Sequence, residues 1–180
     1  INPTDPDNIV GTYQQDRYSN GGAKSNAAAV SVDGGTTWTQ VAIPNLTRCS
    51  PGGGPYERAT DPWLSFGPDG TLHHMSLVLD PDPPGGGFGD NAMVYNRSTD
   101  GGLTWDPAVV LQADDDPRLL NDKNSMTADP NDADVVYAVW DRLRTANGEI
   151  ASSERGRENI FGLGFKGPIL FTRTTDGGDT

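Results

Sequence analysis

An eight-residue pattern that occurs twice in full and begins a third time is the feature that most constrains this chain. It spans residues 31–38 and 98–105, and it starts again at 174–180. Each copy has Ser or Thr first, Asp in the third position and Gly in the fifth, and the two full copies end in Trp. The aspartates lie at positions 33, 100 and 176, so they are 100 − 33 = 67 and 176 − 100 = 76 residues apart. Such a repeat indicates a chain built from several copies of one structural unit.

The pattern predicts a hairpin with a locked turn. An Asp side chain accepts hydrogen bonds from backbone N–H groups just after it, and Gly adopts positive φ at little cost. The Trp then starts the return strand, where its large apolar surface can pack against the sheet. We therefore assign a structural role, and no chemistry, to the pattern residues Ser31, Asp33, Gly35, Trp38, Ser98, Asp100, Gly102, Trp105, Thr174, Asp176 and Gly178.

Composition favours a turn-rich all-β chain. The 180 residues include 23 Gly and 14 Pro, which disfavour helices, and 34% are hydrophobic, enough for a core. The formal net charge of −12 argues against nucleic acid or an anionic membrane surface as a partner. No apolar run approaches the roughly 20 residues of a membrane-spanning helix, so membrane insertion is not expected. The single cysteine, Cys49, cannot form an intrachain disulfide, and its role stays open.

Hydrophobic runs between turn signals predict the strands, and the runs recur in the same order along the chain. Within the run at 72–79, the tail 77–79 is continuously apolar, as in a strand covered on both faces. The predicted strands are 9–14, 27–31, 38–43, 63–66, 72–79, 92–97, 108–111, 124–128, 135–140 and 169–173. Four antiparallel strands per repeated unit are typical of β-propeller blades.

The boxes, written [Ser/Thr]-x-Asp-x-Gly-x-x-Trp, resemble the Asp-box or BNR repeat of the sialidase-like β-propeller superfamily. The resemblance implies about three blades of a larger propeller whose remainder is missing from this chain. The expected blades are about 1–44 without a first strand, about 61–111, and about 122–180 without a last strand. In that superfamily the box is the turn between the third and fourth strands of a blade, away from the functional face.

Antiparallel connectivity then predicts which end of the sheets carries function. The boxes and the turns at 67–70 and 129–134 share one end. The opposite end is expected to hold long loops at 15–25, 44–61, 80–90, 112–123 and 141–167. Loops on a rigid scaffold are the usual place for binding and catalysis.

Several charged residues lie at or next to these loops. The resemblance implies an arginine clamp for a substrate carboxylate, which Arg17, Arg58 and Arg142 could form, with Lys123 as a further binding candidate. The alternative is that these cations pair with the abundant aspartates at the surface. The Arg-Ile-Pro motif that marks the first clamp arginine in sialidases is absent.

Two aspartates and one tryptophan complete the candidate site. Asp61 and Asp122 are expected at equivalent positions, at the entry of an innermost strand, where they could line a central channel as catalytic candidates. The alternative is hydrogen bonding between blades. Trp140 could stack on a sugar, or could pack in the core.

These features lead to one leading functional hypothesis and one alternative. The first is a secreted or cell-surface, sialidase-like propeller that acts on glycans, with glycoside hydrolysis as its candidate activity. The second is a non-catalytic Asp-box propeller that binds a glycan or a protein. No cofactor or metal is expected, because the adjacent His73 and His74 would point to opposite faces of a strand and the acidic run 114–116 lacks the spacing of a calcium loop.

Overall fold

The computed structural model describes residues 1–84, 86–145 and 165–178. This part of the chain is entirely β, and no helix in it is long and apolar enough to cross a membrane. Its strands are β1 (Ile9–Arg17), β2 (Ala23–Ser31), β3 (Thr39–Ala42), β4 (Arg58–Phe66), β5 (Leu72–Leu79), β6 (Asn91–Ser98), β7 (Val109–Asp114), β8 (Leu119–Ala128), β9 (Val136–Thr145), β10 (Phe165–Lys166) and β11 (Ile169–Thr174). Each strand expected from the sequence therefore has a counterpart in the structure.

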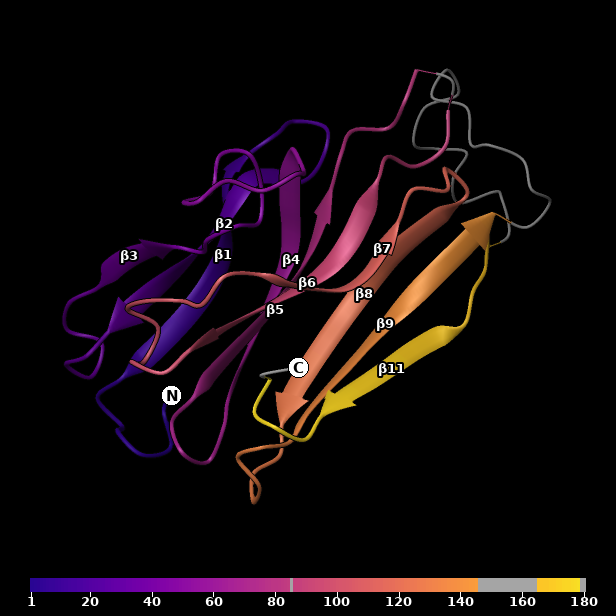
Figure 1. Ribbon diagram of the computed structural model, residues 1–180. Coiled ribbons are helices and arrows are strands. Elements are labelled where there is room, and N and C mark those ends of the chain that lie inside the picture. The colour runs from indigo at the N-terminus through magenta and orange to yellow at the C-terminus, as the bar shows by residue number, and fades with distance from the viewer. Residues whose placement is uncertain (85, 146–164, 179–180) are drawn as a thin grey trace.

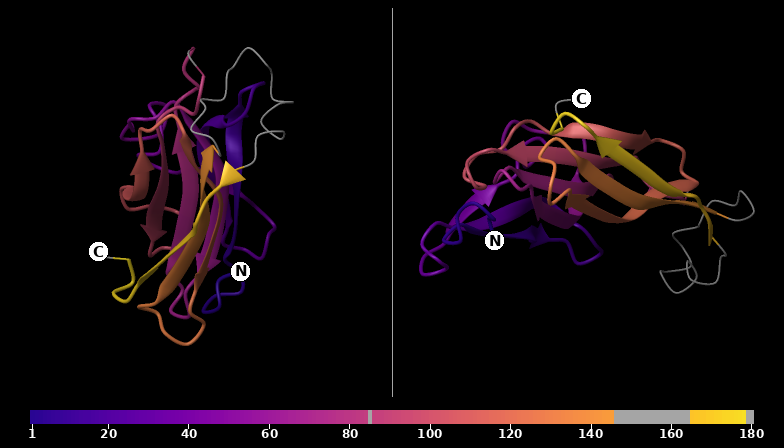
Figure 2. Two further views of the ribbon diagram at one scale, coloured as in Figure 1. Left: turned by 90° about the vertical axis from the view of Figure 1, so that its right-hand side faces the viewer. Right: turned by 90° about the horizontal axis from the view of Figure 1, so that it is seen from below.

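The strands form three antiparallel units that lie side by side in chain order (Figures 1 and 2). The first unit is β1–β2–β3, the second is β4–β5–β6–β7, and the third is β8 to β11 around β9. A single residue pair, Ala23 with Ala59, joins the first two units into one seven-stranded sheet. Because neighbouring strands are antiparallel, successive connections alternate between the two ends of the units.

The second unit is buried on both faces, as the continuous apolar run predicts. Seven of the eight residues of β5 are buried. Leu77 packs in the core shared with the third unit, whereas its neighbour Val78 packs in the core shared with the first. The cross-unit cores bring Met75, Met93 and Tyr95 against Met126, Val136 and Trp140 on one side, and Val78, Ala92 and Val94 against Ala28, Val30 and Ile43 on the other.

The box turns are closed by their own polar side chains. In the second copy, Thr104 donates from its backbone N and its hydroxyl to the carboxylate of Asp100, at 2.8 and 2.6 Å. Ser98 donates to the same carboxylate at 2.9 Å and accepts from the Gly102 N–H at 2.9 Å. The first copy repeats these bonds, and the described part of the third repeats those of its Thr and Gly. These bonds support the structural role predicted for the boxes.

The box tryptophans are less buried than expected. The indole N–H of Trp38 donates a hydrogen bond to the carbonyl of Gly35 at 3.0 Å, and that of Trp105 donates to the carbonyl of Gly102 at 3.1 Å. Trp105 is half-buried and meets the ring of His74 edge-on, but Trp38 stays 51% exposed. The indole hydrogen bond is satisfied locally, so the turn does not need the packing that the sequence predicts.

A glycine substitution tests how tightly the second box is packed. Gly102 has a φ of 94°, and a Cβ built on it would lie 3.3 Å from Leu72, Val10 and Val30. We expect Gly102→Ala to lower the free energy of unfolding by about 1–3 kcal/mol. The matched control is Gly11→Ala, where a Cβ meets nothing within 4 Å, and which should change stability by no more than about 0.5 kcal/mol. Urea unfolding of both variants measures their free energies of unfolding, and equal stabilities of the two would contradict the prediction.

The innermost strands are longer than the sequence predicts. β4 begins at Arg58 and β8 at Leu119, within stretches expected to be loops. A bulge interrupts each strand, between Thr60 and Trp63 and between Asp122 and Ser125. Bulges break the alternation of apolar and polar residues, and for this reason the sequence pattern predicts a later start for both strands than the structure has. The connections at this end are accordingly short at 18–22 and 115–118.

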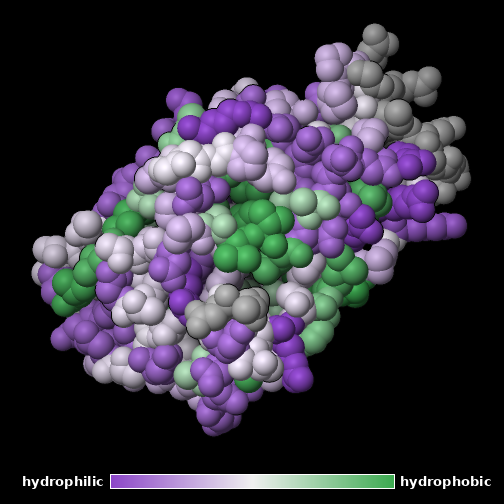
Figure 3. Space-filling model, in the orientation of Figure 1, coloured by the Kyte–Doolittle hydropathy of each residue, from purple (hydrophilic) through white to green (hydrophobic). Residues whose placement is uncertain are grey.

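The connections between the strands define the two ends of the units. We call the end with the turns 32–38, 67–71, 99–108 and 129–135 the box end, and the end with the connections 18–22, 43–57, 80–90 and 115–118 the bulge end. In the view of Figure 3 most of the surface is hydrophilic, with hydrophobic patches between. That agrees with the net charge of −12.

Candidate functional site

Unusual backbone geometry gathers toward the bulge end of the first strands of the units. Asp16 in β1, Asp61 in β4 and Lys123 in β8 have φ values of 57°, 48° and 55°. Asn45 is the one other non-glycine residue with positive φ in the described chain. Non-glycine residues in this region carry backbone strain, and bulges often re-aim side chains next to functional sites. These bulges therefore mark the position of the candidate site.

The bulges correct the expected equivalence of Asp61 and Asp122. Trp63 pairs with Met75 just after the first bulge, and Ser125 pairs with Val139 just after the second. Counted from these pairs, Asp61 corresponds to Lys123, not to Asp122. Both residues lie inside their strands, beyond the entry where the sequence analysis placed Asp61 and Asp122.

Asp122, Lys123 and Asp141 nevertheless lie next to one another in β8 and β9, and the charge of Asp61 acts on Lys123. Asp122 and Asp141 face each other across β8 and β9 as a residue pair. Lys123 Nζ lies 3.2 Å from Asp122 Oδ2, and the backbone N–H of Lys123 donates to Asp122 Oδ1 at 2.8 Å. The hydrogen bond and charge of Asp122 raise the pKa of Lys123, and the charges of Asp61 and Asp141 raise it further. We call Asp61, Asp122, Lys123 and Asp141 the carboxylate cluster.

The cluster is more acidic than a structural ion pair requires. Like charges directly opposite on neighbouring strands destabilise a sheet. The single Lys123, whose side chain is 71% exposed, leaves a formal surplus of two negative charges among these four side chains. Charge that the fold does not need at an accessible position is a mark of a functional site.

Amide side chains hold the bulge of β4 from both neighbouring units. Asn124 donates from Nδ2 to the carbonyl of Asp61 at 2.9 Å, and the Asn26 amide N–H lies 3.5 Å from the carbonyl of Thr60. Asn124 is only 7% exposed and Asn26 is fully buried. Within the described chain, the Oδ1 atoms of both have no hydrogen-bond partner, and neither does Oε1 of Gln14, which pairs with Asn26 across β1 and β2. Buried acceptors without a donor need a ligand or water.

Trp63 is a candidate that the sequence analysis did not name. It follows the β4 bulge and is 45% exposed, although it belongs to an innermost strand. Trp63 pairs with Met75, and Ser65 lies two residues further along β4, so these three side chains share one face of the sheet. Met75 and Ser65 both contact the third unit. Trp63 therefore lies on the side of β4 that faces the third unit. The sequence Asp-Pro-Trp indicates this position, because a proline inside a strand is typical of a bulge.

Arg58 lies elsewhere, at the junction of the first and second units. Its side chain is largely buried and donates to Asn20 Oδ1 and to the carbonyl of Gly21, both at 2.8 Å. Its guanidinium also lies over the ring of Tyr18, 4.4 Å from the centroid. Arg58 thus holds the 18–22 connection in place.

Arg142 lies at the junction of the second and third units. Its guanidinium forms a two-point ion pair with Asp114, through Nε at 2.8 Å and through Nη2. Burial alone would raise the pKa of Asp114, but hydrogen bonds from Arg142 and Asn121 lower it below its usual value. The indole of Trp140 donates to Asn121 at 3.0 Å in the same network.

The structure therefore divides the candidates named from the sequence. It brings Asp61, Asp122 and Lys123 together, whereas it holds Arg58 and Arg142 in two different junctions. Arg17 is exposed at the end of β1. Trp140 is 4% exposed and belongs to the core, so it is a packing residue and its face is not available to a sugar.

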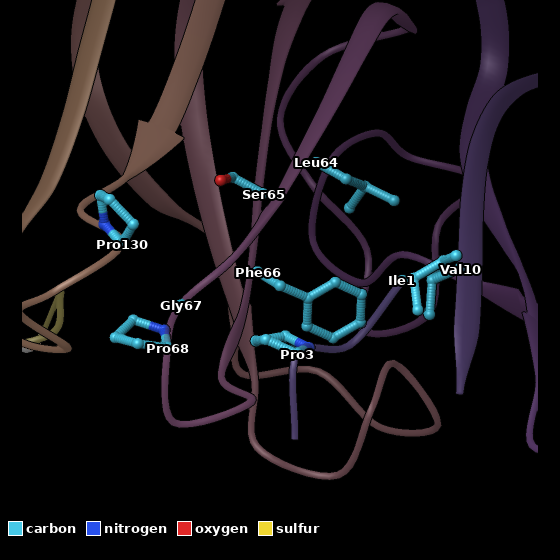
Figure 4. Close-up of a pocket in the computed structure, with 9 residues that line it drawn as sticks. All are labelled: Ile1, Pro3, Val10, Leu64, Ser65, Phe66, Gly67, Pro68 and Pro130. Atoms are coloured by element: carbon cyan, nitrogen blue, oxygen red, sulfur yellow. The ribbon is translucent and has the colours of Figure 1, made fainter. Parts of the chain in front are cut away.

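A hollow formed by described residues lies at the other end and carries little chemistry. It has a volume of about 580 Å³ and is lined by Ile1, Pro3, Val10, Leu64, Ser65, Phe66, Gly67, Pro68 and Pro130. Figure 4 shows Leu64 and Phe66 extending toward Val10 and Ile1, with Ser65 turned the other way. These side chains include no acid or base. We therefore place the candidate site at the carboxylate cluster.

The described residues include no group of three or more His, Cys, Asp or Glu side chains arranged to hold a metal ion. His73 and His74 are both fully buried and face opposite sides of β5, as expected. His73 Nδ1 lies 2.7 Å from the hydroxyl of Tyr95, and His74 contacts Trp105.

Comparison with solved structures identifies similar folds. The Hadza microbial sialidase Hz136 superposes with a TM-score of 0.56 at 17% sequence identity, over 97% of this chain and 34% of its own. A polysaccharide lyase of family PL25, an ulvan lyase bound to -[GlcA(1-4)Rha3S]-, superposes with a TM-score of 0.51 at 16% identity, over 95% of this chain and 36% of its own. The same lyase is also matched in a second structure with equal values.

These matches show the fold. The chain has an antiparallel all-β fold that is similar to those of this sialidase and this lyase, and it spans about a third of the length of the structures it matches. No protein-family model matches the chain, and no curated protein does. The Asp-box resemblance therefore stands on the box residues themselves and on the hydrogen bonds they make.

Proposed function

We propose that this chain forms part of a sialidase-like propeller that binds and processes glycans, with the sugar bound at the carboxylate cluster. The observation that carries the proposal is the acidic surface that Asp122 and Asp141 form beside Lys123 in β8 and β9, together with the exposed ring of Trp63 in β4. Carboxylates accept hydrogen bonds from sugar hydroxyls, and an exposed indole offers a flat apolar surface to a pyranose ring. The proposal includes a secreted or cell-surface location, and it is supported by the fold shared with a sialidase and a polysaccharide lyase.

In the catalytic form of this proposal, Asp122 and Asp141 carry out glycoside hydrolysis. Residues directly opposite on neighbouring strands have Cβ atoms roughly 5 Å apart. Retaining glycosidases place their two carboxyl groups at a similar separation, one as nucleophile and one as acid and base. One of these two carboxylates then serves as the nucleophile and the other as the acid and base.

A non-catalytic glycan receptor is the second candidate, and the two arginine placements favour it. Arg58 and Arg142 bind Asn20, Gly21 and Asp114, so they serve the junctions between units. Hydrolysis of a panel of oligosaccharides separates the two forms. In the catalytic form Asp141→Asn abolishes turnover but keeps binding, whereas a receptor shows binding and no turnover.

An aromatic substitution tests the proposed sugar surface. We expect Trp63→Ala to weaken oligosaccharide binding about tenfold, because it removes the indole face beside the cluster. The matched control is Trp38→Ala, which removes an equally exposed indole at the box end and should leave binding unchanged. Isothermal titration of both variants with cellotetraose and lactose provides the measurement. Equal affinities in the two variants would move the site away from Trp63.

A further inference from the structure

The face of the third unit that points away from the second unit carries exposed apolar side chains. Ile169 is 73% exposed, Phe171 61% and Val139 36%. The ring of Tyr137 stacks on that of Phe171, with 6.1 Å between the centroids. Leu170, between the two exposed residues of β11, instead packs in the core shared with the second unit. Clustered exposed apolar residues of this kind mark an interaction surface.

Strand register shows that this face corresponds to one that is buried elsewhere in the chain. Leu72 pairs with the first residue of the second box, Ser98, and Val136 pairs with that of the third, Thr174. Counted from these two pairs, the exposed residues Val139, Asp141, Ile169 and Phe171 correspond to Met75, Leu77, Met93 and Tyr95. Those four residues of the second unit are at most 7% exposed, because the third unit packs on them. The third unit therefore presents the same face, with Asp141 in the place of Leu77.

The first unit presents the other half of the same junction. Ile9 pairs with the first residue of the first box, Ser31. Counted from this pair, Ile9, Gly11, Tyr13 and Ala27 correspond to Val136, Ala138, Trp140 and Leu170, the residues with which the third unit packs on the second. The kinds of side chain agree, with a β-branched residue first, Gly or Ala second and an aromatic ring third. In the first unit, however, Gly11 is exposed and Tyr13 is 37% exposed.

The two box tryptophans differ for the same reason. Trp105 packs against the core shared by the first and second units, where its ring meets His74. Trp38 holds the equivalent position in the first box and is 51% exposed, because no further unit of the described chain packs on the first unit. The first and third units lie on opposite sides of the molecule, so their outer faces do not meet within one chain (Figure 1).

We propose that a second copy of this chain covers the outer face of the third unit with the outer face of its own first unit. This head-to-tail contact repeats the junction that the chain already forms between its second and third units. Two such contacts join two copies into a closed pair of six units, within the four to eight blades of known propellers. The inference does not depend on the proposed glycan function. Because Asp141 belongs to the contact face, the carboxylate cluster lies at the boundary between the copies.

Sedimentation equilibrium of the unmodified chain tests the association. We expect a mass twice that of the 19.1 kDa chain, with a dissociation constant of about 10 µM or less. Each copy has a formal net charge of −12, so the copies repel one another at long range. Added salt screens this repulsion and should therefore tighten the pair.

One substitution on each face assigns the contact to its residues. Phe171→Asp places a charge at an apolar contact and should weaken the pair at least about 100-fold. Gly11→Arg should have the same effect on the partner face, and a Cβ at Gly11 meets nothing within 4 Å, so the folded chain accommodates it. The control is Val110→Asp, which changes a 54% exposed valine of β7, outside both faces, and should leave the mass unchanged. Thermal melts establish that each variant is folded.

A mixture of the two variants identifies the head-to-tail geometry. Phe171→Asp alone and Gly11→Arg alone each lack one of the two faces, so both should be monomeric. Their equal mixture retains one intact face of each kind and should again form pairs, held by a single contact. A Gly11→Arg chain that still pairs overturns the proposed contact, because two third units then meet face to face. An unmodified chain that stays monomeric at about 100 µM, or an equal loss in Val110→Asp, also overturns it.

Discussion

Between pH 6.5 and pH 4 the folded chain is expected to lose roughly 6 kcal/mol of stability, about 3 kcal/mol for each of two buried histidines. Burial lowers the pKa of His73 and of His74 from 6.5 to about 4. The unfolded chain therefore takes up protons in this range that the folded chain does not. Since the unfolded state binds more protons, stability is fully present above pH 6.5 and falls as the pH decreases toward 4.

The surroundings of each histidine explain why the two contributions differ in detail. Asp69 counteracts part of the lowering of the His73 pKa, and Arg97 adds to it. His74 lies between the first and second units beside Trp105, and the side chain of Asn96 offsets only part of the lowering of its pKa by burial. The aspartates with lowered pKa values, such as Asp33 at about 2, add their own loss only below about pH 4.

Urea unfolding at a series of pH values measures this dependence. Two histidines predict a slope that approaches about 2.7 kcal/mol per pH unit near pH 5, because each proton contributes about 1.36 kcal/mol per unit. His74→Leu removes one of the two groups and should halve the slope. A slope that is unchanged in His74→Leu, or a stability that is flat from pH 6.5 to pH 4.5, would contradict the prediction.

Asp114→Ala is expected to destabilise the chain by about 3–5 kcal/mol. The carboxylate of Asp114 is nearly buried, and it binds both the guanidinium of Arg142 and the amide of Asn121 at 2.9 Å. Its removal leaves a partly buried cation without its acceptor, and the fully buried amide of Asn121 keeps only Asn91 Oδ1, at 2.8 Å. Asn121 also holds the indole of Trp140, so the loss extends into the core between the second and third units.

The neighbouring Asp115 supplies the control. It is exposed on the same connection, and Asp115→Ala should change the free energy of unfolding by no more than about 0.5 kcal/mol. A double-mutant cycle with Asp114→Ala and Arg142→Met measures the coupling of the ion pair. We expect the double variant to be more stable than Asp114→Ala alone, because the unpaired guanidinium is then absent. A loss below about 1 kcal/mol in Asp114→Ala would show that the junction does not depend on this pair.

The candidate site was only partly accessible from the sequence. Charged residues before predicted strands indicate Asp61, Asp122 and Lys123, and the structure pairs Lys123 with Asp122. Trp140 was wrongly considered as a sugar platform, because an aromatic residue at the end of an apolar strand has the same sequence signature in the core and at the rim. Trp63 and Asn124 were missed, since only the bulges turn one toward solvent and the other toward the Asp61 carbonyl.

The sequence by itself determined the strands and the box turns of this protein. Those features depend on residues within one short segment, such as the Ser98, Asp100 and Thr104 bonds that close a turn of eight residues. Only the tertiary structure decided which charges meet. Asp61, Asp122 and Asp141 come from different strands, and one extra residue in each bulge shifts the register that places them. The partners of Arg58 and Arg142 likewise belong to other strands or connections, so their structural use depends on how the units pack against one another.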